Sequence, residues 1–159
     1  MIFITVGSQK FQFNRLLEAV DELVENGTIK EEVYAQTGYS DYEPKYYGYK
    51  KFMDRNEFAE MEGKADIVIT HGGTGAIIGA VKQGKKVIAV PRRAKYGEHV
   101  DDHQLQLLKE FEDMNIIMVC YELEDLNKVY EQIGLAKLEP YHSNQMNIIN
   151  SIDNFIEEM

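Results

Sequence analysis

Residues 65–79 read ADIVITHGGTGAIIG, and the fold class can be inferred from them. Its first five residues are typical of a buried strand, and the apolar residues after the glycines are typical of a helix. Gly72, Gly73 and Gly75 lie in the turn between the two. Because they lack Cβ atoms, backbone N–H groups can close on an anion, and the helix N-terminus adds a partial positive charge. The stretch therefore predicts a strand, a phosphate-binding turn and a helix.

The same turn has a purely structural interpretation, in which the glycines only allow tight turning and close helix packing. Thr74 either donates its hydroxyl to a phosphate or caps the following helix. His71, taken alone, indicates a structural turn residue. The turn is neither GxGxxG at the first strand nor a Walker A sequence, since no Gly-Lys-Ser/Thr follows. Simple binding of NAD or ATP is therefore not indicated.

Strands and helices alternate along the rest of the chain. Strands separated by helices of this length imply right-handed crossovers and a parallel sheet covered on both faces. We therefore predict a single doubly wound, Rossmann-like α/β domain over 1–159. Residues 38–50, rich in tyrosine and poor in aliphatic side chains, indicate a loop or an irregular edge. The expected strands are 1–6, 32–36, 66–70, 87–90 and 116–120, and the expected helices are 13–25, 56–64, 76–82, 102–114, 123–133 and 143–158.

Length and composition favour one globular domain. With 159 residues, of which 44% are hydrophobic, the chain can bury a sizeable core. Its net charge of −10 argues against nucleic-acid binding, because phosphate neutralisation requires clustered Lys and Arg. No apolar run reaches the roughly 18–20 residues of a membrane span. The single cysteine, Cys120, and a start without a basic leader segment are typical of a cytoplasmic protein.

Three polar segments directly follow expected strands: Gly7-Ser8-Gln9, 70–75 and 91–104. Ligands of open parallel sheets bind outside the carboxyl ends of the strands, so we expect the three segments to share one rim. The segment 91–104 is the second strong indication of function, since long polar loops in compact domains are usually functional or mobile.

Two histidines and two carboxylates in that segment suggest a metal site: His99, Asp101, Asp102 and His103. Their spacing is not that of a closed ligand set, and no cysteine or third histidine is nearby. Asp102 also fits the N-cap of the helix that follows. We therefore expect no metal.

An aromatic set precedes the second expected helix, with Tyr46, Tyr47, Tyr49 and Phe52. These rings fit a stacking platform for a base or sugar. They fit a partner surface or a covered sheet edge equally well. The sequence leaves these alternatives open.

Together, three motifs resemble a known family: Thr70–Gly75, the strand Gly84–Pro91 and 101–104. They are similar to the C-terminal, donor-binding half of the MurG-type glycosyltransferases. The Val6-Gly7-Ser8 start is similar to that of single-domain relatives. These are the PssE/EpsF-like bacterial polysaccharide glycosyltransferase subunits and the cytosolic subunit of the eukaryotic two-part UDP-GlcNAc transferase. The resemblance spans nearly the whole chain and implies one Rossmann-like half of a GT-B enzyme.

The resemblance implies a site for the diphosphate of a UDP-sugar. Arg92 and Lys95 are possible cations for the departing UDP. Gly79 occupies the position of a family glutamate that binds ribose, and Glu98 is the candidate substitute. The phosphates are expected against a set of turn residues, namely Gly7, Ser8, Gly72, Gly73, Thr74 and Gly75.

The resemblance also implies positions for the uracil and the sugar of the donor. The resemblance places uracil against the backbone of Phe52 and Met53, just before the expected helix 56–64. It places the hydroxyls of the donor sugar at His103 and Gln104. It assigns no general base, which is expected from the other half of the enzyme.

The resemblance further implies a two-component enzyme. A membrane-anchored subunit would supply binding of a lipid-linked saccharide acceptor, and this chain would act only in complex with it. The reaction would transfer a hexosyl group from a UDP-sugar, with inversion, in capsule or exopolysaccharide synthesis. The chain would be cytoplasmic, recruited to the inner face of the membrane through its partner, and would need no cofactor.

Two other functions remain open from the sequence. One is a non-catalytic nucleotide-sugar-binding subunit that regulates a partner. The other is a small enzyme of the nucleotide-sugar epimerase type, although the lack of GxGxxG at the first strand argues against its nicotinamide cofactor. The expected helix 143–158 either docks on a partner or packs on its own sheet.

Overall fold

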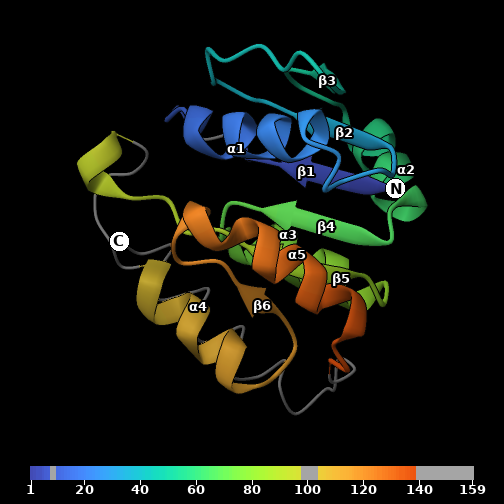
Figure 1. Ribbon diagram of the computed structural model, residues 1–159. Helices are drawn as coiled ribbons and strands as arrows, with labels where there is room; N and C mark the ends of the chain where they lie inside the picture. The colour runs from blue at the N-terminus through green and yellow to red at the C-terminus, as the bar shows by residue number, and fades with distance from the viewer. Residues whose placement is uncertain (8–9, 98–103, 139–159) are drawn as a thin grey trace.

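The computed structural model describes residues 1–7, 10–97 and 104–138, which form an open sheet covered by helices (Figure 1). All neighbouring strands are parallel, in the order β3-β2-β1-β4-β5-β6. This order is that of a Rossmann-like doubly wound sheet, and it confirms the predicted fold class. The strands are β1 (Ile2–Thr5), β2 (Val33–Gln36), β3 (Gly48–Lys50), β4 (Ile67–Thr70), β5 (Lys86–Ala89) and β6 (Met118–Val119).

The helices lie where hydrophobic periodicity predicts them, with small shifts at their ends. The shift that matters is at the glycine turn, where the helix starts at residue 74 instead of 76. The expected helix 143–158 lies outside the described residues. The helices are α1 (Asn14–Glu25), α2 (Arg55–Lys64), α3 (Thr74–Lys82), α4 (Gln104–Asp113) and α5 (Leu126–Leu135), with short 3-10 turns η1 (Ala94–Tyr96) and η2 (Leu123–Asp125).

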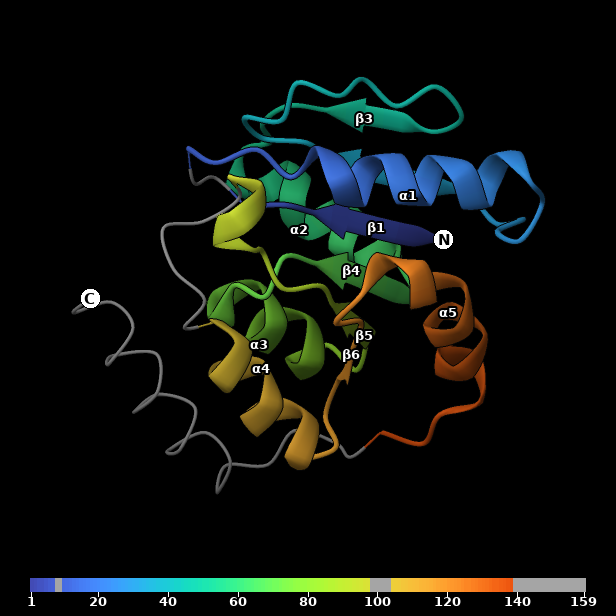
Figure 2. The same cartoon turned by 60° about the vertical axis from the view of Figure 1, so that its left-hand side comes forward.

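Two apolar layers hold the helices on the sheet. Side chains of a strand point alternately to its two faces, so Ile2 and Ile4 join one layer while Phe3 joins the other. The first layer contains residues of α1 and α5, such as Leu16. The second contains residues of α2, α3 and α4, such as Phe111. Figure 2 shows α3 and α4 on one side of β5 and β6 and α5 on the other. Burial on both faces explains why the strands are almost continuously apolar.

The strand register brings three strand ends to one level. Thr5, the last residue of β1, is paired with Gln36 on one side and with Thr70 on the other. The chain leaves β1 toward α1 on the first layer, and it leaves β4 toward α3 on the second layer. The two connections therefore diverge, and a crevice results at the carboxyl ends of these neighbouring strands.

The segment 38–50 agrees with the expected irregular edge, and its last three residues form the edge strand β3, which was not among the expected strands. Three residues with little apolar character carry no periodic signal, so only pairing with β2 reveals this strand. The buried carboxylate of Asp21 stabilises the loop before β3, where it accepts a hydrogen bond from the Tyr42 hydroxyl at 2.5 Å. Tyr47 packs on the core and donates to the Leu17 carbonyl at 2.8 Å. For this tyrosine the structure favours the covered-edge interpretation.

Candidate functional site

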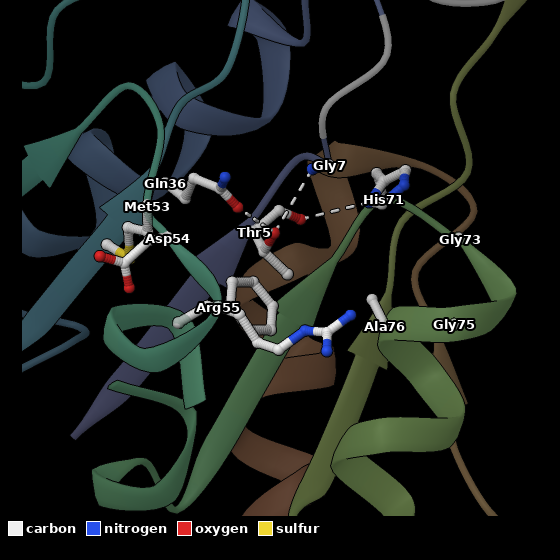
Figure 3. A pocket seen from close by; sticks show the side chains of 11 residues that line it. Thr5, Gly7, Gln36, Met53, Asp54, Arg55, His71, Gly73, Gly75 and Ala76 are labelled. Atoms are coloured by element: carbon white, nitrogen blue, oxygen red, sulfur yellow. Dashed lines mark hydrogen bonds between the residues drawn. The ribbon is translucent and has the colours of Figure 1, made fainter. Parts of the chain in front are cut away.

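A cavity of about 540 Å³ opens where the carboxyl ends of β1, β2 and β4 meet (Figure 3). One wall comes from Gly73, in the turn between β4 and α3, and from Gly75, in the first turn of α3. The start of α2 supplies another wall, and Gly7, beyond the end of β1, also lines the cavity. The position is the switch point at which open parallel sheets bind ligands. Three residues of the expected phosphate set thus share one cavity.

Hydrogen bonds among the strand ends order this side of the cavity. The Thr5 hydroxyl donates to Oε1 of Gln36 at 2.9 Å and accepts from the backbone N–H of Gly7 at 3.3 Å. Nδ1 of His71 lies 3.4 Å from the Thr5 carbonyl oxygen and 3.3 Å from the Thr70 hydroxyl. Thr5, Gln36 and His71 are all buried, so these contacts hold the polar groups in a fixed arrangement.

Two glycines of the site are required by the ring of His71. A Cβ atom on Gly7 would lie 2.7 Å from the ring, and one on Gly73 would lie 2.4 Å from Nε2. Gly7 also has a φ of +76°, and Gly72 has a φ of +83°, a region that favours glycine. The glycines therefore have a packing role, and the two of them that line the cavity also leave room for a ligand.

The first turn of α3 faces the cavity with its backbone. Gly73 is the N-cap and has no side chain to accept the first helical N–H groups. Gly75 and Ala76, in this first turn, line the cavity. Such N–H groups and the positive end of the helix dipole favour an anion at this position. The alternative in which Thr74 caps the helix is wrong, because Thr74 is already its first residue.

The start of α2 forms a wall that the sequence prediction missed. Asp54 is the N-cap of α2 and accepts a hydrogen bond from the N–H of Glu57 at 2.8 Å. This backbone hydrogen bond keeps the pKa of the Asp54 carboxyl below its usual value. Asp54, Arg55 and Phe58 all line the cavity. The Asp-x-x-Glu spacing at 54–57 is a helix-start pattern, and it is the signal that could have found them.

The two residues expected near uracil lie differently. Met53 is half-buried and lines the cavity. Phe52 is 44% exposed and does not line it; its ring contacts the exposed Tyr39 edge-to-face at a centroid distance of 5.1 Å. Of the two residues expected near uracil, only Met53 therefore lies at the cavity. Phe52 instead forms an aromatic pair with Tyr39.

Arg92 does not have the position expected of a cation that meets a ligand. Its side chain is fully buried, and its guanidinium donates to the backbone carbonyls of Val6, Phe11 and Gln12. It also stacks over the Phe13 ring, 5.1 Å from the centroid. The expected donor-facing role of Arg92 is therefore corrected to a structural one, in which it ties the loop after β5 to the segment after β1.

Among the remaining candidates, one lies away from the cavity, one begins a helix, and the others lie outside the described residues. Lys95 is exposed on η1, with Nζ 5.0 Å from the centroid of the Tyr96 ring, and does not line the cavity. Gln104 is the first residue of α4. Ser8, Glu98 and His103 lie outside the described residues.

The described residues contain neither a metal-ligand cluster nor a membrane span. Among residues 1–7, 10–97 and 104–138, no group of three or more His, Cys, Asp or Glu side chains could hold a metal ion. The metal alternative at 99–103 falls outside these ranges. None of the described helices is long and apolar enough to cross a bilayer.

Comparison with known proteins agrees with this geometry. The model of the glycosyltransferase family 28 C-terminal domain matches residues 1–159. None of the curated proteins compared matches the sequence. The structure is similar to that of the glycotransferase of kitacinnamycin, with a TM-score of 0.63 and 15% identity over 85% of this chain and 35% of that chain.

Two further solved structures are similar. MurG of Acinetobacter baumannii has a TM-score of 0.59 and 18% identity, over 98% of this chain and 49% of that chain. The solution structure of ALG13 has a TM-score of 0.59 and 17% identity, over 92% of both chains. At these identities the likeness concerns the fold. The chain spans 35% and 49% of the first two structures, that is, half of their length or less.

Proposed function

Because the chain belongs to the glycosyltransferase family 28 C-terminal domain family, we propose that it is the donor-binding subunit of a two-component glycosyltransferase. Its substrate is a UDP-sugar, from which a hexosyl group passes to a lipid-linked saccharide acceptor in capsule or exopolysaccharide synthesis. The observation that carries this proposal is the cavity at the ends of β1 and β4, closed on one side by the uncapped start of α3.

We propose one orientation for the donor in the cavity. The diphosphate lies against Gly7, Gly73 and the first-turn N–H groups of Gly75 and Ala76, where the helix dipole favours negative charge. The uracil lies toward Met53, at the start of α2. The sugar extends toward the segment that contains His103 and Gln104, as the motif resemblance implies. Ser8, Gly72, Thr74 and Glu98 remain candidates for the surrounding contacts.

The reaction requires charge stabilisation more than covalent help from this chain. The acceptor oxygen attacks the anomeric carbon from the face opposite UDP, the bond from that carbon to the β-phosphate oxygen breaks, and UDP leaves with the electron pair. Donors already oriented toward the phosphates stabilise this charge without reorganisation. Because the attack comes from the face opposite UDP, the anomeric configuration inverts. The acceptor proton goes to a base that we assign to the partner.

The proposed partner rests on the motif resemblance to single-domain glycosyltransferase subunits. The match with the ALG13 structure, over 92% of both chains, supports this part of the proposal. We propose that a membrane-anchored subunit supplies the acceptor half and recruits this cytoplasmic chain to the inner face of the membrane. No cofactor or metal takes part in the proposed reaction.

Reconstitution with the membrane-anchored partner tests the proposal. Thermal shifts against a panel of UDP-sugars identify the donor, and radiolabelled sugar transfer to a lipid-linked acceptor measures turnover. We expect transfer by the pair and none by either protein alone. UDP-sugar binding without transfer, together with a changed activity of the partner, would favour the regulatory alternative. If no UDP-sugar shifts the melting temperature, the donor assignment is wrong.

A further inference from the structure

Arg55 is the only Lys or Arg among the described residues that line the cavity. It is the first residue of α2, exposed to solvent, and lies next to the N-cap Asp54. The cations expected from the sequence are not available there, since Arg92 is fully buried and Lys95 does not line the cavity. The chain has a net charge of −10, and the described wall of the cavity contains one arginine and no lysine. This arginine is therefore the one described cationic side chain that lines the proposed diphosphate site.

The guanidinium of Arg55 has no competing role in the fold. Within the part of the chain that the structure describes, it makes no hydrogen bond or ion pair. The two acidic residues closest to Arg55 in the sequence, Asp54 and Glu57, bind other groups. Asp54 accepts the N–H of Glu57, and the Glu57 carboxylate pairs with Lys50 at 2.6 Å. The five N–H donors of Arg55 are therefore available to a ligand.

The position of Arg55 is also unfavourable for its own helix. The N-terminal turn of a helix carries a partial positive charge, so a cation at the first helical position is repelled. Helix formation and side-chain pairing therefore give no reason for arginine here. Figure 3 shows the side chain extending from α2 across the cavity toward Ala76, in the first turn of α3.

We propose that Arg55 binds the diphosphate of the nucleotide sugar from the side opposite the start of α3. The guanidinium presents parallel N–H donors that match two phosphate oxygens, while the N–H groups of α3 approach from the other wall. The leaving UDP is thus held between a cation and a helix N-terminus. This inference rests on the proposed donor-binding function and adds the residue that distinguishes a diphosphate from an uncharged nucleoside.

Calorimetry with uridine, UMP and UDP tests this role on the full chain. We expect Arg55→Ala to weaken UDP binding on the order of 10- to 100-fold, the usual loss for a hydrogen bond to a charged group. Uridine affinity should stay unchanged, and Arg55→Lys should show an intermediate loss for UDP. Lys51→Ala removes an exposed cation four positions upstream, outside the cavity lining, and should leave UDP affinity unchanged.

The possible outcomes distinguish the role of Arg55 from the proposed binding of a UDP-sugar. Equal changes for UDP and uridine, or no change for either, would overturn the assignment of Arg55 while donor binding stands. Failure of the wild-type chain to bind UDP would overturn both. Arg55→Ala should also melt at the same or a slightly higher temperature, because it removes a cation from a helix N-terminus. A folding defect is therefore not expected to obscure the result.

Discussion

The imidazole of His71 lies so close to the α-carbon of Gly73 that a Cβ atom there would lie 2.4 Å from Nε2. A Cβ atom on Gly7 would meet the same ring at 2.7 Å. The buried histidine thus determines the residue type at two positions that line the cavity. The glycine turn is held in shape by this ring, and its backbone can face a ligand because no side chain intervenes.

Replacement of Gly73 should affect both binding and stability. We expect Gly73→Val to abolish UDP binding, because the new side chain fills the approach to the first turn of α3 and displaces His71. Overpacking of this kind costs about 1–3 kcal/mol of unfolding free energy. Isothermal titration with UDP and chemical denaturation measure the two effects.

A double-mutant cycle shows whether His71 is the cause. The stability cost of Gly73→Ala should be smaller in the background of His71→Ala, since the clashing ring is then absent. Gly63→Ala serves as the control, because nothing lies within 4 Å of a Cβ atom there. That helix substitution should leave UDP affinity intact and raise stability by about 0.5–1 kcal/mol. Unchanged UDP affinity of Gly73→Val would contradict the phosphate assignment.

Arg92 should prove to be a stability residue. Arg92→Ala leaves the carbonyls of Val6, Phe11 and Gln12 without their donor, and we expect a loss of about 3 kcal/mol or more in unfolding free energy. Arg92→Lys should recover part of this, because a compact ammonium cannot reproduce the spread of the guanidinium donors. Urea denaturation measures the difference.

The exposed Lys95 provides the matched control for Arg92. Lys95→Ala should change unfolding free energy by no more than about 0.5 kcal/mol. UDP affinity of Arg92→Lys should equal that of the wild type wherever the variant is folded. A variant of wild-type stability that nevertheless binds UDP poorly would return Arg92 to the ligand site.

Glu62 should make stability depend on pH. Burial raises the pKa of its carboxyl, and Lys85 opposes this in part. Oε1 accepts from the Gln83 amide at 2.7 Å, while Oε2 has no hydrogen-bond partner in the described structure. Because the folded state binds this proton more tightly, the stabilisation is present below the ordinary value of 4.5 and is lost as pH rises through the raised pKa.

Glu62→Gln removes the ionisation and retains an acceptor for Gln83. Relative to wild type, the variant should therefore gain stability as pH rises from about 4 to about 7, measured by denaturation at several pH values. Glu60→Gln, an exposed position on the same helix, should show no such trend beyond its surface pair with Lys64. A wild-type advantage that grows with pH would contradict the assigned direction.

Local sequence patterns predicted most of the helices and strands, but parts of the site follow from contacts between distant segments. The apolar run Ile67–Thr70 and the periodic residues of α3 are local signals, and so are the glycines between them. The Asp54–Glu57 spacing carried a helix-start signal as well, yet only the structure brings Arg55 to the cavity. Arg92 could not be assigned correctly from its polar loop, because its partners lie about 80 residues earlier in the chain.

The parallel α/β fold can be read from local sequence patterns, because hydrophobic periodicity and glycine turns act over a few residues at a time. The sequence also determined that the turn at 70–75 is able to present backbone N–H groups. Tertiary structure decided which groups meet there, because β1 pairs with β4 and places Gly7, His71 and Gly73 against one another. The tertiary structure also determines which arginine can meet a ligand, because it buries Arg92 and leaves Arg55 at the cavity. Burial depends on contacts between segments that are distant in the sequence, so no local pattern predicts it.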